Sequence, residues 1–230
     1  DGQPISSSAD YSEADPYNNR DPRLAATIIY TGNSYLMADG TKKVINCDKG
    51  ANKDGYGFSS DCTPTGYYLK KYWDKDHSTI VNLASGLNII LIRYADILLM
   101  NAEANAELGT LNQSVWDLTI KPIRARAGFT KSSALEFPGT GADLINIVRR
   151  ERRSELAFEG LRYNDIVRWK TAETALNGWC HGLKTNDVVG TDNGYVRIEK
   201  RTFDKAKHYL WPIPQTERDL NKNLSQNPNW

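Results

Sequence analysis

The sequence predicts a mainly α-helical protein with long loops and a few short β-strands. Residues 88–108 and 144–158 contain neither proline nor glycine and place apolar residues near helical spacing, so each predicts a helix. Many of the 17 glycines and 9 prolines lie in turn-forming sequences between such segments. Short runs of β-branched and aromatic residues at 26–30 and 67–73 predict the strands.

A chain of 230 residues has room for one large domain or two small ones. The element pattern divides it into a loop- and strand-rich part at residues 1–86 and a helical core at residues 87–170. Residues 171–230 contain further loops and end in proline-rich extended sequence. We expect these three parts to form one structural domain.

The helix at residues 88–108 is followed by a second predicted helix that runs to about Ala127. Asn112 or Ser114 can cap this second helix, and Pro122 inside it predicts a kink or a late start. The pair resembles one tetratricopeptide-type repeat, and no second copy follows at that period. Because one such pair cannot bury its own apolar face, we expect self-association or a need for further repeats.

Turn sequences indicate where the chain reverses. Asp-Gly pairs at 39–40 and 54–55 predict two hairpin turns. The sequence Asp-Asn-Gly-Tyr at 192–195 predicts a third, before a strand at 196–198. The rest of the segment 171–200 is expected to be mostly loop.

Glutamates in the second long helix form a column of like charge. Glu151, Glu155 and Glu159 are four residues apart, a spacing at which like charges destabilise an isolated helix. Arginines that dock from elsewhere would neutralise the column. We interpret the block as a structural ion-pair network that comprises Glu151, Arg152, Glu155, Glu159, Arg162 and Arg168. The alternative is a glycoside hydrolase in which Glu151 and Glu155 act as paired catalytic carboxylates.

Several functional classes find no support in the sequence. A net charge of +1 does not favour a nucleic-acid partner. No apolar run is long enough to span a bilayer, and the chain begins with Asp rather than with a signal peptide. Phosphate-loop, dinucleotide and histidine-based nucleophile motifs are missing, so we expect no cofactor and no catalytic residue.

A glycine-rich loop carries four oxygen-bearing side chains of the kind that bind calcium, at Asp48, Asn52, Asp54 and Asp61. Their order is not that of an EF-hand, because Gly50 stands where the first aspartate should be. A surface turn without metal is the expectation.

Three cysteines leave one disulfide possible. Cys47 and Cys62 lie in one loop-like region, and closing that loop would contribute about 3 kcal/mol. Such a bond would suit an exported protein. Whether the pair is bridged stays open, and Cys180 is expected to be a small buried side chain.

Aromatic residues at or beside glycine-rich turns are the candidate ligand-binding residues. A flat ring stacks on the apolar face of a sugar while neighbouring polar side chains bind the hydroxyls. The alternative is that each ring only anchors its own loop to the core. The candidates are Tyr35, Tyr56, Phe58, Trp73, Trp179 and Tyr195.

Five stretches, in order and over nearly the whole chain, resemble motifs of the SusD/RagB family of outer-membrane nutrient-binding lipoproteins. The resemblance is to the C-terminal half of that family. Each motif alone is weakly specific, and the set is specific together. The stretches are NRDPRL at 19–24, IRYADILLMNAEANAEL at 92–108, IRARAG at 123–128, residues 151–169, and YLWPIP at 209–214 with QNP at 226–228.

The resemblance implies a SusD-like scaffold of tetratricopeptide-like helices that supports a loop-rich ligand face. It implies a non-enzymatic protein on the extracellular face of the outer membrane, which captures oligosaccharides and delivers them to a SusC-like TonB-dependent transporter. Contact with the membrane would be made only by an N-terminal lipid anchor, which this chain lacks together with the earlier repeats. Tyr67, Trp169 and Trp211 fall inside family motifs, which implies core positions. A tetratricopeptide-like adaptor with no glycan ligand is the other non-enzymatic reading.

Overall fold

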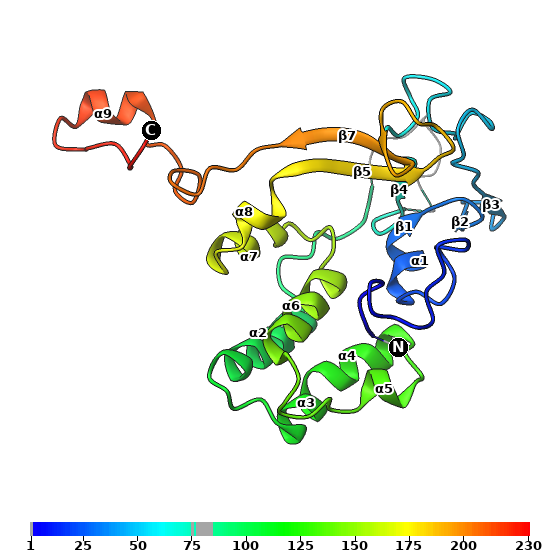
Figure 1. The fold of residues 1–230 in the computed structure, drawn as a ribbon, viewed down its shortest axis with the longest axis horizontal. Helices are drawn as coiled ribbons and strands as arrows, with labels where there is room; N and C mark the ends of the chain where they lie inside the picture. Colours follow the sequence, from blue (N-terminus) through cyan, green and yellow to red (C-terminus); the bar gives the residue numbers. More distant parts are fainter. Residues whose placement is uncertain (1, 75, 77–84) are drawn as a thin grey trace. The chain divides into compact units, whose positions relative to one another are not determined.

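A computed structural model describes residues 2–74, 76 and 85–230. The chain forms two compact units (Figure 1). The first unit comprises Asp1–Asn46 with Tyr68–Glu159, and the second comprises Cys47–Tyr67 with Gly160–Trp230. Helices alternate with long loops and short strands in both, as in the predicted fold class.

The first unit is built around α2 (Tyr94–Glu107) and α6 (Leu144–Glu155), which lie side by side in Figure 1. Its core holds Leu99, Ala102, Trp116, Ile120 and Val148, all at 0% exposure. The shorter helices of this unit are α1 (Arg23–Thr27), α3 (Gln113–Leu118), α4 (Ile120–Ala127) and α5 (Ser132–Leu135).

Two antiparallel strand pairs complete the first unit. β1 (Ile28–Ile29) pairs with β4 (Tyr68–Leu69), and β2 (Ser34–Leu36) pairs with β3 (Lys42–Val44). The second pair confirms the turn predicted at residues 39–40.

The second unit contains a three-stranded antiparallel sheet in the order β5-β7-β6. Its small core joins Ile166, Ala172 and Phe203. β6 and β7 flank residues 193–194, so the predicted third turn is confirmed. The elements are α7 (Arg162–Arg168), α8 (Ala172–Ala175), β5 (Gly178–Lys184), β6 (Thr191–Asp192), β7 (Tyr195–Arg201) and α9 (Gln215–Leu220).

The helix predicted at residues 88–108 begins six residues later, at Tyr94. Arg93 is extended, with φ −131° and ψ 158°, and its guanidinium binds Glu155 and Glu159. This ion pairing holds Arg93 in an extended conformation, so residues 88–92 lie outside the helix. The apolar side chains of residues 89–92 are exposed to solvent. Ile89 is 87% exposed.

The helix at 113–127 is interrupted at Thr119, so the late start that Pro122 predicts is confirmed. Asn112 caps α3 by accepting a hydrogen bond from the Val115 amide at 3.1 Å. The helix predicted at 144–158 ends at Glu155 instead.

Two strand predictions were too long. Over 26–30 the chain is helical to Thr27, because the Asp21 carboxylate accepts from the Arg23 amide at 2.9 Å and starts α1. Over 67–73 only Tyr68 and Leu69 are paired. After Leu69 the amides of Lys70 and Lys71 both donate to the Thr27 carbonyl oxygen, at 2.9 and 3.0 Å, so the ladder ends there. The positive φ of 79° at Tyr72 then interrupts the extended run.

Loop predictions in the second unit also needed correction. The expected hairpin turn at 54–55 has no flanking strands among the described residues and is a compact loop. A Cβ on Gly55 would lie 2.5 Å from the Asp48 carbonyl oxygen, so this loop closes on itself. Half of the segment 171–200 is strand, contrary to the prediction that it is mostly loop. β5 is mostly exposed and its pairing with β7 shifts register twice, so it shows no apolar alternation in sequence.

The structure places all three cysteines as thiols, so the Cys47–Cys62 bond is not formed. Cys47 is buried, and its burial, with the charges of Asp54 and Asp48, raises the pKa of its thiol to about 11. Trp211 was expected in the core and is 72% exposed, with its ring 6.0 Å from that of Tyr163.

Candidate functional site

The glutamate column on α6 lies in the first unit and is contacted by cations from distant segments. Glu151 is 3% exposed and accepts a hydrogen bond from Arg23 Nη1 and another from Arg124 Nε, both at 2.7 Å. Arg23 lies just inside α1 and Arg124 lies on α4, so this carboxylate joins three helices of the first unit.

Glu155, the next acid of the column, binds three arginines. Its carboxylate accepts from Arg93 Nη1 at 2.5 Å, from Arg126 Nη2 at 2.6 Å and from Arg23 Nη1 at 3.0 Å. Burial alone would raise the pKa of Glu155, but the hydrogen bonds from Arg93 and Arg23 outweigh it and lower this pKa below its ordinary value.

Glu159, beyond the end of α6, binds Lys71 and Arg93. Lys71 Nζ lies 2.5 Å and Arg93 Nε 2.8 Å from its carboxylate oxygens. The same two cations also donate to the carbonyl oxygens of Ala157 and Glu155, at 2.9 and 2.7 Å. Cations at the C-terminal end of a helix satisfy its unpaired carbonyl groups and its dipole.

The three arginines of the predicted network have different partners. Arg152 Nη1 donates to the buried Asp96 of α2 at 2.5 Å, which ties α6 to α2. In the second unit, Arg168 donates to Asp165 at 2.9 Å. Arg162 and Arg168 both lie over the ring of Trp169, at 5.8 and 4.9 Å.

The candidate aromatic residues divide between the two units. Tyr35 and Trp73 belong to the first unit and are brought together edge to face, with ring centroids 4.7 Å apart. Trp73 is 38% exposed, and its Nε1 donates to the Leu36 carbonyl oxygen at 2.8 Å. This pair therefore anchors its own hairpin and still presents a ring to solvent.

The other four candidates belong to the second unit. Phe58 is 53% exposed, and Tyr56 is half-buried in the same loop. Tyr195 is half-buried at the start of β7, and Lys184 lies over its ring at 5.4 Å. Trp179 lies on β5 and is 41% exposed.

Polar side chains surround Trp179 on the three-stranded sheet. Arg197 lies 5.6 Å from the Trp179 ring and 3.1 Å from Asp192, and Asp192 also contacts His181 Nε2 at 2.8 Å. All four side chains are between 35 and 44% exposed. We call Trp179, His181, Asp192 and Arg197 the Trp179 cluster. It offers a flat apolar ring next to both hydrogen-bond donors and acceptors.

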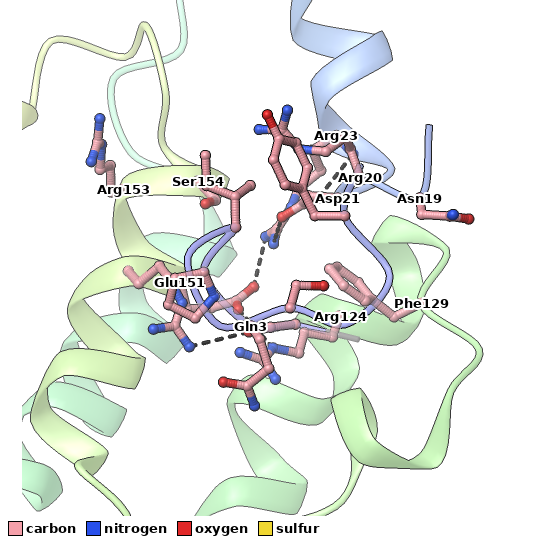
Figure 2. A pocket seen from close by; sticks show the side chains of 16 residues that line it. Gln3, Asn19, Arg20, Asp21, Arg23, Arg124, Phe129, Glu151, Arg153 and Ser154 are labelled. Atoms are coloured by element: carbon pink, nitrogen blue, oxygen red, sulfur yellow. Dashed lines mark hydrogen bonds and ion pairs between the residues drawn. The ribbon is translucent and has the colours of Figure 1, made fainter. Parts of the chain in front are cut away.

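A cavity of about 470 Å³ lies beside Glu151 in the first unit (Figure 2). Its lining combines the N-terminal residues, the loop before α1, and side chains from α4 and α6. Figure 2 shows Arg23 between Asp21 and Glu151, with Phe129 on the wall nearest Arg124. The six candidate aromatic residues do not line this cavity.

Sequence reasoning missed two sets of residues. One set comprises the cations that dock on the column. The only signal was that the four arginines lie inside the quoted family motifs and that Lys71 lies in the predicted strand at 67–73. The other set comprises the polar members of the Trp179 cluster, which become neighbours only through strand pairing. The missed residues are Arg23, Lys71, Arg93, Arg124, Arg126, His181, Asp192 and Arg197.

The sequence matches the model of the SusD family over residues 1–230. The chain belongs to the SusD family. Among solved structures, a SusD-like carbohydrate-binding protein from Bacteroides fragilis is 34% identical with a TM-score of 0.73, over 95% of this chain and 44% of that one. A second SusD-like protein from the same species is 28% identical with a TM-score of 0.70, over 93% and 40% of the two chains.

Curated SusD-family relatives give the same result. SusD-like protein P2 of Formosa agariphila is 35% identical over 146 residues, which are 62% of this chain and 26% of that protein. The chain thus spans less than half the length of the relatives it matches. Among the residues described by the structure, no helix is both long and apolar enough to cross a bilayer. In the same residues, no three His, Cys, Asp or Glu side chains group as metal ligands would.

Proposed function

We propose that this SusD-family chain binds oligosaccharides without altering them and passes them to a SusC-like TonB-dependent transporter at the extracellular face of the outer membrane. The Trp179 cluster carries the binding part of the proposal, because it combines an exposed indole with three hydrogen-bonding side chains. Family membership supports it, as does the likeness to a Bacteroides fragilis protein described as carbohydrate-binding. Delivery and location rest on the family alone.

The chemistry of the Trp179 cluster suits a sugar. The C–H face of a pyranose ring stacks on an indole, and sugar hydroxyls both donate and accept hydrogen bonds. Asp192 accepts, Arg197 donates, and His181 does either according to its tautomer. Tyr195 lies two residues before Arg197 on β7, so its side chain leaves the same face of the strand.

The experiment is a calorimetric titration of the protein with a panel of neutral oligosaccharides. We expect Trp179→Ala to lower the affinity for the glycan roughly tenfold, which corresponds to about 1.4 kcal/mol of binding free energy. Trp230→Ala is the matched control, because Trp230 has a similar exposure of 44% in the same unit. Equal affinities for wild type and Trp179→Ala would remove the Trp179 cluster from the proposal. If no oligosaccharide of the panel binds, the tetratricopeptide-like adaptor without a glycan ligand is favoured.

The adaptor reading has an observation of its own. Apolar side chains remain exposed before α2 and along its outer side, and such surfaces mark protein contacts. They are Ile89, Leu91, Ile92, Tyr94, Ile97 and Met100, with exposures from 48 to 88%. If this surface binds another protein chain, sedimentation should show self-association. A stable monomer would count against the adaptor hypothesis.

The glycoside hydrolase reading is the weakest of the three. A general acid must stay protonated near neutral pH, and the lowered pKa of Glu155 has the opposite effect. Retention of any glycan turnover by Glu155→Gln would remove Glu155 from a catalytic role.

A further inference from the structure

The cavity beside Glu151 carries an excess of positive charge. Five arginines and only two carboxylates, those of Asp21 and Glu151, are among its lining residues. Both carboxylates are already engaged, since Arg23 binds Asp21 at 2.6 Å and Glu151 at 2.7 Å, and Arg124 binds Glu151 at 2.7 Å. The charge that remains belongs to Arg20, Arg150 and Arg153.

These three arginines make no ion pair with a carboxylate in the described part of the chain. Arg20 Nη1 donates to the Pro16 carbonyl oxygen at 2.7 Å, and Arg150 Nη2 donates to that of Gly2 at 3.1 Å. Arg153 is exposed, and among the described residues it has neither a hydrogen bond nor a ring contact. Each of the three guanidinium groups therefore keeps donors for a ligand.

The surroundings of Arg150 make this excess charge costly in the absence of a ligand. Burial and the neighbouring Arg124 lower the pKa of Arg150, which means that its cation is destabilised where it lies. Glu151 and Asp143 offset part of this effect. A bound anion would stabilise Arg150 further, as a carboxylate does for the other arginines of this unit.

The size and walls of the cavity limit what can bind. A volume of about 470 Å³ lies in the range of small-molecule sites and exceeds what a bare inorganic ion needs. The rings of Tyr11 and Phe129 line it, each already beside an arginine, at 5.5 Å from Arg20 and from Arg23 respectively. The walls are therefore partly apolar and partly cationic.

We propose that this cavity is an oxyanion-binding site for a molecule of monosaccharide size that carries a carboxylate or a sulfate group. Arg150 and Arg153 on α6 and Arg20 on the loop before α1 supply the charge. Guanidinium groups bind such groups through two parallel hydrogen bonds, which a neutral sugar cannot match. No residue of the Trp179 cluster lines the cavity.

The test is calorimetric titration at fixed ionic strength with D-glucuronate, D-glucose 6-sulfate and neutral D-glucose. We expect one or both anionic sugars to bind and glucose to give no signal, and the tighter anion identifies the group. The double variant Arg150→Gln/Arg153→Gln should weaken that anion at least tenfold. Arg201→Gln, which removes one positive charge from an exposed pair in the second unit, should change the affinity less than twofold.

Three results would overturn the proposal: no signal with either anion, glucose binding to Trp179→Ala as tightly as the anions do, or the same loss in Arg201→Gln as in the double variant. Arg153 has no described contact, so Arg153→Gln alone keeps the test valid if the double variant does not fold. Trp179→Ala should leave anion binding unchanged, which separates this site from the proposed glycan surface.

Discussion

The substitution Glu155→Gln tests the glutamate column directly, because it removes one negative charge and keeps the side-chain shape. The Glu155 side chain is 1% exposed and lies between 2.5 and 3.0 Å from nitrogens of three arginines. A glutamine would retain one acceptor oxygen and would turn an NH₂ group toward guanidinium groups that only donate. Buried positive charge would then lack part of its compensation.

The expected cost follows from what each arginine keeps. Breaking a buried ion pair by removing one partner costs about 3 to 5 kcal/mol. Arg23 keeps Asp21 and Glu151, Arg93 keeps Glu159, and Arg126 is 63% exposed and returns to water. The lower end, about 3 kcal/mol, is therefore expected, and it lowers the melting temperature by about 6 to 12 °C for a chain of this length.

The assay is urea unfolding followed by tryptophan fluorescence. The free energies of unfolding of wild type and variant are compared with a common m value. The control is Glu199→Gln, since Glu199 is 63% exposed and pairs only with the exposed Arg201 among the contacts described. It should change the free energy of unfolding by less than about 0.5 kcal/mol. A loss below about 1 kcal/mol in Glu155→Gln would show that the column does not hold the helices together.

Three further predictions concern stability. The pKa of Glu155 in the folded protein is lowered from an ordinary value of 4.5. The stabilisation that its charge gives the folded state is therefore full above pH 4.5 and is lost as the pH falls through the folded pKa. A stability advantage of wild type over Glu155→Gln that persists in strong acid would contradict this. Gly66→Ala should cost about 2 kcal/mol more than Gly40→Ala in thermal melts, since both have positive φ but only the first places a Cβ 1.6 Å from Leu183; equal losses would refute the clash. Asn112→Ala should cost about 1 kcal/mol by the same measurement, and no change would show that the cap of α3 is dispensable.

Local sequence signals predicted those parts of the fold that local interactions determine. The Asn112 cap, the break near Pro122 and the Asp39-Gly40 turn each depend on residues within a few positions of one another. The start of α2 could not be predicted this way. Its position depends on Arg93 binding Glu155, which lies 62 residues further along the chain.

The candidate site shows the same division. Aromatic residues at turns were visible in the sequence, and so was the spacing of the glutamates. The partners were not, because Arg23 reaches Glu151 across 128 residues. Arg197 lies beside Trp179 because β5 and β7 pair with two shifts of register. The sequence of these strands shows no apolar alternation from which this pairing could be predicted.

Saturation-transfer NMR on the protein mixed with neutral oligosaccharides measures binding and chemistry in one sample. We predict saturation of sugar-ring protons in the wild type, its loss in Trp179→Ala, and an oligosaccharide spectrum that stays unchanged over hours of incubation. Absence of saturation for every oligosaccharide, or the appearance of new reducing-end signals, would contradict a protein that holds glycans on an exposed ring without cleaving them.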